Sequence, residues 1–424
     1  MSEQTQSPEK KFSMRDLLAI KDYRFLWSGQ IISNIGSSMT NLALLLLVNH
    51  LTGSTAALAT MAIVLALPSL LFGMFAGVLI DRADRKKVMI AADLFRAIIV
   101  LGFMLVDSAD KIWILYAIGF VQASVDTFFA PARGALVPNI VPKEGLLTAN
   151  SVSETSRILF SLVGTGIAGF LIGQFEDYRL IFGVDSVTFL LSALLIMQIR
   201  YTRKLGAGKQ PIDAGQVFSE LREGLKVTFS NRVLAGTIVA FAVTMLGLGA
   251  VNILLVPLLV DDLMVKETWF AAIEFSQTAG MVLAGALVAS LASRLRPTHI
   301  LAGSLIGLGI AVGFMALPTA VWHILIILFA AGLTITPLQA AGSTIIQTAV
   351  PDEMRGRTGS ANNMFITTAQ LVSMGLAGVL ADMLGARQVF MLGGGLVVLA
   401  GIVALLIFRG AEIGLPTPGM QTAD

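Results

Sequence analysis

Five ionisable residues inside long apolar stretches are the first candidates for chemistry. Asp126, Glu154 and Glu274 are acids, and Arg133 and Arg157 are bases. A charge is costly to bury in an apolar environment, so one that is retained there usually serves an ion, a proton or another charge. A proton carrier requires a desolvated acid that pairs only transiently with a cation, and Asp126 and Glu274 fit this role best. A structural ion pair explains each residue about equally well, and Glu154 and Arg157 share a helix face at three-residue spacing.

Two further pairings follow from position. Asp93 and Arg96 are three residues apart, so we expect them to form a structural ion pair on one helix face. Asp126 lies in the cytoplasmic half of the apolar stretch 111–137, and we expect Arg85 or Arg133 to be its partner.

Several other kinds of chemistry are excluded. The chain has no cysteine, which removes disulfides, thiolate metal sites and cysteine nucleophiles. His50, His299 and His323 are far apart and show no zinc-binding spacing. The net charge of +2 and the lack of a basic, aromatic-rich patch argue against nucleic acid as a partner. We therefore predict a protein that is not an enzyme and that carries no metal or cofactor.

The composition indicates a membrane protein. Hydrophobic residues make up 55% of the chain and charged residues 13%, against about 25% charged in soluble domains. The mean hydropathy is +0.81. A helix needs about 20 mostly apolar residues to cross a bilayer. The stretches that meet this requirement, numbered here as spans 1 to 12, are 24–50, 55–80, 87–107, 111–137, 148–174, 180–200, 231–260, 268–293, 298–317, 320–348, 358–384 and 387–408.

The distribution of Lys and Arg predicts the orientation. These residues are concentrated in the even-numbered connections and in the segment before the first span, whereas the odd-numbered connections carry few. Basic loops remain on the cytoplasmic side, so both termini are expected there, with tails over 1–22 and 409–424. The first apolar run is too long for a signal peptide. We expect a multi-pass protein of a bacterial inner membrane.

The chain divides into two related halves. Its longest connection, residues 201–230, contains an amphipathic stretch and separates six spans in 23–200 from six in 231–408. Residues 141–144 (VPKE) recur as 350–353 (VPDE), and 166–169 (GIAG) recur in the same register as 375–378 (GLAG). An even number of helices per half orients both repeats the same way, which is typical of the major facilitator fold. The predicted fold is all-α, with twelve transmembrane helices in two six-helix parallel-repeat bundles.

A charged motif follows span 2. Residues 77–87 read GVLIDRADRKK, and this segment resembles the major facilitator signature GxxxDRxxRRK. The resemblance implies a conformational latch, in which an acid beside the start of a helix in the other half, near Thr358, holds one side of the transporter closed. The glycines of the motif permit the two helices to approach closely. Arg85 would pair with a carboxylate on span 4. The residues assigned to this latch are Gly73, Gly77, Asp81, Arg82, Arg85 and Lys86.

Most of the chain resembles the drug:proton antiporter branch of this superfamily, which includes macrolide efflux proteins and the enterobactin exporter. The resemblance is carried by residues 29–36 (GQIISNIG), 67–73 (LPSLLFG), 92–97 (ADLFRA) and 128–133 (FFAPAR). It implies efflux of amphipathic compounds coupled to proton entry. The chain departs from the branch where span 5 reads GTGIAG in place of GPxxxG. Gly119 stands in place of an arginine and Ser37 in place of an acid, and these positions bear on proton coupling.

Polar residues at helical spacing mark the expected substrate cavity. Lipid penalises such faces, so they point inward, either to a cavity or to hydrogen bonds between helices. Three apolar residues complete the expected wall, which suits lipophilic substrates better than small charged metabolites. The polar candidates are Gln30, Asn34, Ser37, Asn41, Asn252, Gln277, Gln339, Ser343, Asn363 and Gln370, and the apolar ones are Phe128, Phe241 and Met245.

These observations predict a secondary active transporter that exports drug-like or macrolide-type compounds with proton coupling, by rocker-switch alternating access. The expected partners are protons, a small amphipathic molecule or lipid, and the surrounding membrane lipids, and the expected state is a monomer. A lysophospholipid transporter, or flippase, is the alternative, because an apolar cavity suits lipids as well as drug-like compounds. A membrane sensor that transports nothing is a third possibility.

Overall fold

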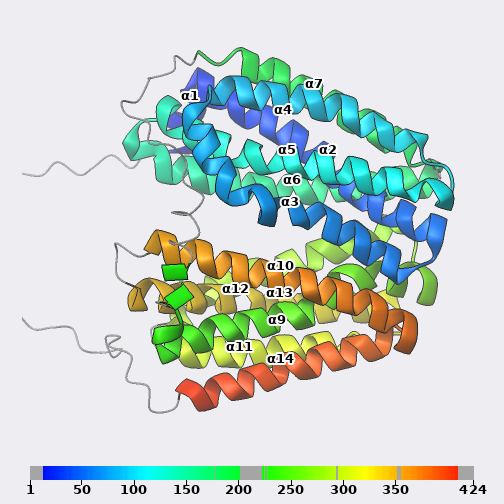
Figure 1. Cartoon of the computed structure of the whole chain (residues 1–424), viewed down its shortest axis with the longest axis vertical. Coiled ribbons are helices and arrows are strands. Elements are labelled where there is room, and N and C mark those ends of the chain that lie inside the picture. Colours follow the sequence, from blue (N-terminus) through cyan, green and yellow to red (C-terminus); the bar gives the residue numbers. More distant parts are fainter. Residues whose placement is uncertain are drawn as a thin grey trace, which may run out of the picture. The chain divides into compact units, whose positions relative to one another are not determined.

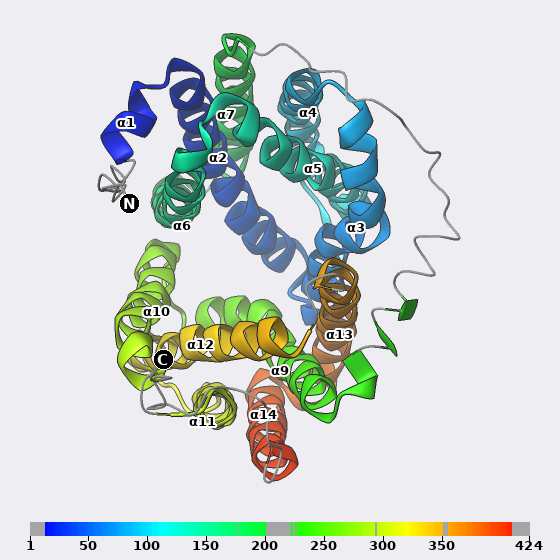
Figure 2. The same cartoon turned by 90° about the vertical axis from the view of Figure 1, so that its left-hand side faces the viewer.

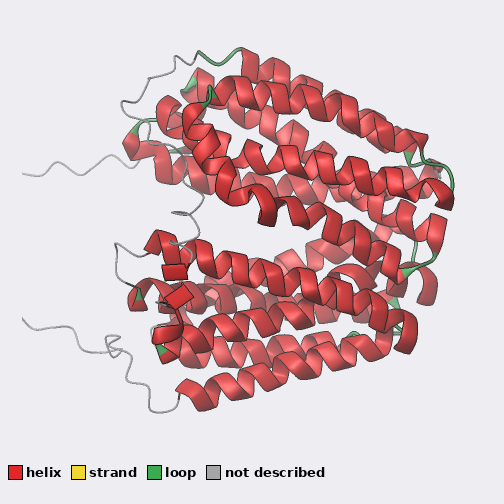
Figure 3. Cartoon of the chain, in the orientation of Figure 1, coloured by secondary structure: helices red, strands yellow, loops and turns green. Residues whose placement is uncertain are grey.

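A computed structural model describes residues 13–175, 177–200, 222–223, 225–226, 228–292, 295–350 and 355–408. Over these ranges the chain is helical and has no strand (Figure 3). Twelve helices in the described part are long and apolar enough to cross a membrane, which confirms the predicted fold class. They are formed by α2 (Lys21–Thr52), α3 (Thr55–Arg82), α4 (Arg85–Ile99), α5 (Ile112–Ile140), α6 (Leu146–Phe175), α7 (Arg179–Met197), α9 (Arg232–Pro257), α10 (Phe270–Ala292), α11 (Pro297–Phe314), α12 (Val321–Ala349), α13 (Arg355–Leu384) and α14 (Ala386–Phe408) (Figure 1).

Short elements join or extend these helices. A 3₁₀ segment, η1 (Val100–Leu105), continues α4, and a π-helical turn, η4 (Leu258–Asp262), continues α9. Three further 3₁₀ turns, η2 (Ala109–Lys111), η3 (Lys143–Gly145) and η5 (Glu267–Trp269), precede α5, α6 and α10. The amphipathic segment expected in the linker 201–230 lies mostly outside the described residues.

The N-terminal segment differs from the expected solvated tail. Residues Met14–Ala19 form a short helix, α1, which begins with a capping box between Ser13 and Asp16. Leu17 on this helix is fully buried and packs in a cluster with Tyr23, Met89 and Leu136. The expectation of a solvated tail over 1–22 is therefore wrong at Leu17, because two adjacent leucines in a six-residue helix are too short a hydropathy signal to predict burial.

The chain folds into two compact units. The first unit comprises Met1–Ala43, Leu71–Asp107 and Trp113–Lys209. The second unit comprises Leu44–Leu70, Ser108–Ile112 and Gln210–Asp424. This division does not follow the expected halves, since the end of α2 and the start of α3 group with the later helices.

In the first unit, α4 and α7 pack against each other through polar as well as apolar side chains. Ser186 of α7 donates a hydrogen bond to the Ala97 carbonyl over 2.6 Å, and Ser192 donates to Asp93 over 2.7 Å. Phe103 and Phe182 pack nearby with ring centroids 5.2 Å apart. These contacts fix the rotation of α4, which determines where Asp93 and its neighbour Arg96 point.

In the second unit, α14 lies beside α11 and α9 (Figure 2). Gly394 is the point of closest approach, because a Cβ atom there would collide with the backbone of Gly309 and Gly313. A GxxxG pair of this kind lets helix backbones approach closely and gain van der Waals contact. Gly395, one residue further on, faces open space.

The second unit also holds the end of α2 and the start of α3 against later helices. Asn49 donates a hydrogen bond to Asp261 over 3.1 Å. Thr55 hydrogen-bonds to the Asp382 carboxylate and, over 3.2 Å, to the Gly378 carbonyl. The start of α3 is therefore tied to α13 by side-chain hydrogen bonds.

Candidate functional site

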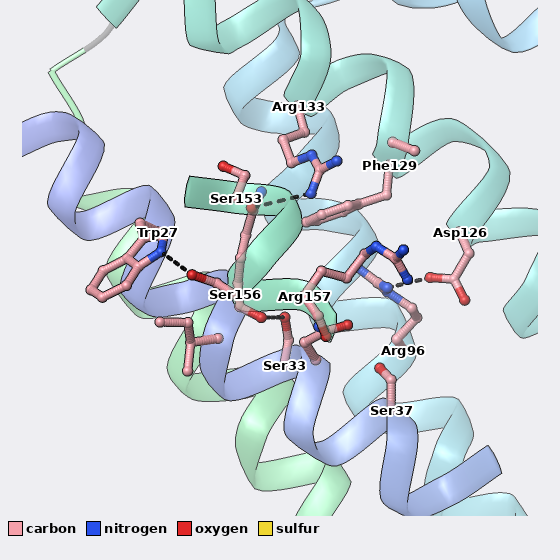
Figure 4. Close-up of a pocket in the computed structure, with 14 residues that line it drawn as sticks. Trp27, Ser33, Ser37, Arg96, Asp126, Phe129, Arg133, Ser153, Ser156 and Arg157 are labelled. Atoms are coloured by element: carbon pink, nitrogen blue, oxygen red, sulfur yellow. Dashed lines mark hydrogen bonds and ion pairs between the residues drawn. The ribbon is translucent and has the colours of Figure 1, made fainter. Parts of the chain in front are cut away.

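A cavity of about 290 Å³ lies within the first unit, between α2, α4, α5 and α6 (Figure 4). We call it the Arg133 pocket. Its walls combine charged, hydroxyl and aromatic side chains, which is unusual for the interior of membrane-spanning helices. The lining residues are Trp27, Gln30, Ile31, Ser33, Asn34, Ser37, Arg96, Asp126, Phe129, Ala130, Arg133, Ser153, Ser156 and Arg157.

Helices α2 and α6 form one wall, held together by hydrogen bonds. The indole N–H of Trp27 donates to Ser156 Oγ over 3.0 Å, and the Asn34 amide donates to the Arg157 carbonyl over 3.0 Å. Gly164 of α6 meets α2 so closely that a Cβ atom there would collide with the Ile35 carbonyl. This packing orients the polar face of α2 toward the pocket.

Arg96 enters the pocket from α4 and is almost fully buried. Its guanidinium group binds Asp93 over 2.5 Å and forms a second ion pair with Asp126 of α5. The group also lies 4.4 Å from the ring centroid of Phe129 and 4.6 Å from that of Phe189, which are cation–π distances. The expected Asp93–Arg96 pair is present.

The partner expected for Asp126 was wrong. Asp126 binds Arg96 rather than Arg85 or Arg133. Sequence spacing could not show this, because the pairing depends on how α4 and α5 are rotated against each other. The Asp126 side chain is 49% exposed, so it borders the pocket, whereas that of Asp93 is fully buried.

Glu154 and Arg157 form a bidentate pair on α6. Arg157 donates from Nη2 to Glu154 over 2.6 Å and from Nε over 3.1 Å. Both side chains are about half exposed, at 57% and 52%. The two residues therefore share a helix face, as expected, and neutralise each other's charge at the rim of the pocket.

Arg133 stands apart from these pairs. Its one hydrogen bond within the described structure is a long contact of 3.4 Å to the Gln30 side-chain oxygen. None of the ion pairs among the described residues includes it. Arg133 lies two residues after Pro131, which interrupts the hydrogen bonding of α5 between the turn of Asp126 and that of Arg133.

Comparison with known proteins establishes the family. The model of the transmembrane secretion effector family matches residues 15–414. The chain belongs to this family, within the major facilitator superfamily. It is thus a membrane transporter of the major facilitator type.

The transporter is similar to two efflux proteins over nearly its whole length. It is 25% identical to macrolide efflux protein A of Streptococcus pyogenes, covering 90% of this chain and 95% of that one. It is 26% identical to the multidrug efflux pump Tap of Mycolicibacterium fortuitum, covering 91% and 95%. A bacterial homologue of the human lysosomal transporter Spinster shares the fold, with a TM-score of 0.73 at 14% identity over 94% of this chain and 98% of that one.

Parts of the transporter's expected latch can be placed. The side chains of Gly77, Asp81 and Arg82 lie outside the described residues, and so does the expected approach of Asp81 to α13. Gly73 faces open space in the first unit. Arg85 donates over 2.8 Å to the carbonyl of Ala135 on α5, so its hydrogen bond to span 4 ends on a backbone oxygen rather than the expected carboxylate.

Lys86 belongs to the same motif and binds the end of another helix. Its ammonium group donates to the carbonyls of Met197 and Ile199 over 2.7 and 2.8 Å. Met197 is the last residue of α7, and Ile199 follows two residues later. A cation at a helix C-terminus satisfies backbone oxygens that otherwise lack partners.

The cavity candidates divide between the two units. The structure brings Gln30, Asn34 and Ser37 into the Arg133 pocket, whereas Asn41 is exposed outside it. Phe128 stacks on Phe72 with ring centroids 6.4 Å apart and does not line the pocket. The remaining candidates lie on helices of the second unit and do not line it either: Phe241, Met245, Asn252, Glu274, Gln277, Gln339, Ser343, Asn363 and Gln370.

Two of these second-unit residues have informative surroundings. The Phe241 ring packs where Gly342 of α12 leaves space for it. Glu274 of α10 makes no hydrogen bond or ion pair with any described residue, and its side chain is partly buried. Glu274 thus remains a candidate for binding a proton.

Five polar or aromatic lining residues were not singled out from the sequence: Trp27, Ser33, Phe129, Ser153 and Ser156. Ser153 and Ser156 lie on α6 beside the Glu154–Arg157 pair, so the polar stripe of this helix was a usable signal. Trp27 and Phe129 had no such signal, because an aromatic residue in an apolar helix is equally common in the core.

Proposed function

We propose that this protein exports amphipathic compounds from a bacterial cell, and that the Arg133 pocket forms part of the substrate site. The observation that carries the proposal is a polar, charged cavity with aromatic walls among membrane-spanning helices. Binding sites of this kind hold the apolar body of a ligand on aromatic rings and orient it with a few polar groups. The efflux proteins with similar sequences support the direction of transport.

We place the transporter in the inner membrane with both termini in the cytoplasm, on the basis of its Lys and Arg distribution. It would work as a monomer, by rocker-switch movement of two six-helix halves. Asp81 and the residues near it would hold one side closed between cycles. In the plane of the bilayer, membrane lipids would cover the apolar outer faces of the helices.

Proton entry is the proposed driving force. A proton that moves down a membrane potential yields about 2.3 kcal/mol per 100 mV, which is sufficient for tenfold accumulation. Asp126 is the preferred proton acceptor, because it borders the pocket and shares Arg96 with Asp93. Protonation of Asp126 would leave Arg96 bound to Asp93 and would alter the charge of the pocket wall.

Proteoliposomes with an imposed pH gradient test this proposal. We expect the wild-type protein to move a fluorescent amphipathic dye only when the gradient is present. Asp126→Asn should reduce gradient-driven transport at least about tenfold, since about 1.4 kcal/mol of coupling corresponds to that factor, while the protein still elutes as a folded species. Asp81→Asn should slow transport without preventing membrane insertion. Asp110→Asn, in the exposed turn before α5, is the matched control.

Four outcomes would each count against one part of the proposal. Full coupling in Asp126→Asn would remove Asp126 as the acceptor, and loss of coupling in Glu274→Gln would move that role to α10. Wild-type turnover in Asp81→Asn would defeat the latch. Lysophospholipid movement that does not depend on the pH gradient would favour the flippase alternative. A pocket that contains both Arg133 and aromatic walls would also suit a lysophospholipid.

A further inference from the structure

We infer that the ligand of the Arg133 pocket carries an anionic group, a carboxylate or a phosphate, and that Arg133 binds it. This inference rests on the proposed transport of amphipathic compounds and narrows their chemical class. It departs from the expectation of an apolar cavity without clustered charge, because the fold brings three arginines and two carboxylates to one pocket and its rim.

The balance of charges in the pocket singles out Arg133. Arg96 is shared by two carboxylates, and Arg157 is neutralised by the bidentate contact with Glu154. Arg133 alone among the lining cations forms no ion pair with a carboxylate within the described structure. A cation inside a membrane protein is costly unless an anion compensates it. A ligand that supplies the anion would remove this cost on binding.

The chemistry of the guanidinium group fits this role. It presents five N–H donors in a planar fork that matches the oxygens of a carboxylate or a phosphate. The contact to Gln30 is long, at 3.4 Å, and leaves most of these donors available. The Gln30 amide nitrogen is buried and has no hydrogen-bond partner, so a second donor lies next to the first. Two adjacent donors would hold an anion with a defined orientation.

The neighbouring walls indicate the rest of the ligand. Trp27 and Phe129 border the same pocket and would pack against an apolar body (Figure 4). Arg96, Asp93 and Asp126 form a cluster of one cation and two carboxylates, and Asp126 is the exposed carboxylate. A cationic group on the ligand would therefore lie toward Asp126, and the anionic group toward Arg133. An amphipathic anion or zwitterion fits this arrangement, whereas a simple lipophilic cation gives Arg133 no ion-pair partner.

Binding of matched amphipaths to the full-length protein in nanodiscs tests the inference, with binding to empty nanodiscs subtracted. Pyrenebutyrate and pyrenebutyltrimethylammonium share a ring and a chain and differ in charge. We expect the wild-type protein to bind the carboxylate more tightly by about tenfold or more, the size expected of a hydrogen-bonded charge pair. Arg133→Gln should abolish this preference, and Arg133→Lys should restore part of it, because lysine keeps the charge but not the fork.

A double variant provides the matched control. Asp262→Asn with Arg387→Gln removes one anion and one cation from an ion pair that does not line the pocket, so the net charge is unchanged, and the preference for the carboxylate should persist. Equal binding of the two pyrene compounds by the wild type, or a preference that survives Arg133→Gln, would overturn the inference. Elution of each variant as a monodisperse species shows that it is folded.

Competition distinguishes the possible sources of the anion. Displacement by 1-oleoyl-lysophosphatidic acid but not by 1-monooleoylglycerol would identify a lipid phosphate, and displacement by inorganic phosphate alone would identify a free anion. Both support anion recognition at Arg133. If the preference is present but neither pyrene compound nor lysolipid crosses a proteoliposome membrane, the proposed export fails while the binding inference stands.

Discussion

In the first compact unit the ionisable side chains of Asp93, Arg96 and Asp185 are buried, whereas the buried polar residues described in the second unit are hydroxyls and amides. Asp185 accepts hydrogen bonds from Thr40 over 2.6 Å and from Thr188 over 3.1 Å. The second unit brings backbones together at Gly394 and at similar glycines on its other helices, a kind of contact that the first unit also has at Gly164.

The difference shows two ways to hold apolar helices together in a membrane. Ion pairs and hydrogen bonds specify which faces meet, and they also leave polar atoms that a ligand can use. Glycine contacts gain dispersion energy from close approach and leave no such atoms. In the described structure the charged pocket lies in the unit with buried charges, as this reasoning requires.

Among the variants that test this difference, removal of Arg96 should cause the largest fall in the free energy of unfolding. Arg96→Leu leaves Asp93 and Asp126 without their shared cation, and loss of one partner from a buried ion pair costs about 3–5 kcal/mol. We expect a large fall in the free energy of unfolding, measured by reversible denaturation in mixed micelles. Arg157→Leu breaks a half-exposed pair, for which about 0–1 kcal/mol is typical. Equal losses in the two variants would show that burial does not set the strength of these pairs.

A methyl group at Gly394 should have an intermediate effect. The added Cβ of Gly394→Ala would meet backbone atoms of Gly309 and Gly313, which cannot rotate away. Overpacking of this kind costs about 1–3 kcal/mol. Gly395→Ala is the control one position along α14, where the space is open, and it should be neutral or slightly stabilising because alanine favours helix. A Gly394→Ala protein as stable as its control would mean that close approach is not what holds α11 and α14 together.

The smallest effect should come from the polar contacts that the second unit does contain. Thr55→Val removes the hydrogen bonds to Asp382 and the Gly378 carbonyl. Hydrogen bonds between membrane helices contribute about 0.6 kcal/mol on average. A double-mutant cycle of Thr55→Val with Asp382→Asn should give a coupling energy of this size. Thr60→Val is the control, since the Thr60 hydroxyl donates within its own helix. A coupling energy as large as the fall in the free energy of unfolding caused by Arg96→Leu would show that the two units do not differ in the strength of their polar contacts.

Helix number and position could be predicted from the sequence because they depend on local hydropathy alone. Twelve apolar stretches gave twelve membrane-length helices in the described structure, with small shifts at the ends. The buried Leu17 on α1 could not be predicted, since a six-residue helix is too short for a hydrophobic periodicity to be detected.

The charged site was only partly predictable, for a geometric reason. Spacing along one helix predicted the pairs Asp93–Arg96 and Glu154–Arg157, since residues three apart share a face. The second partner of Arg96, Asp126, comes from another helix, and its identity depends on the relative rotation of α4 and α5. The isolation of Arg133 could not be predicted either, because it follows from where every neighbouring carboxylate goes.

Pro131 makes α5, which forms one wall of the pocket, easier to bend at that residue. Helix α5 carries Asp126 before this residue and Arg133 after it, and a proline lacks the N–H that would brace the two turns. A bend at Pro131 therefore changes the separation of the acidic and basic groups while α2, α4 and α6 keep their packing. Narrowing around a bound molecule can begin inside a single helix, before any larger part of the protein rotates.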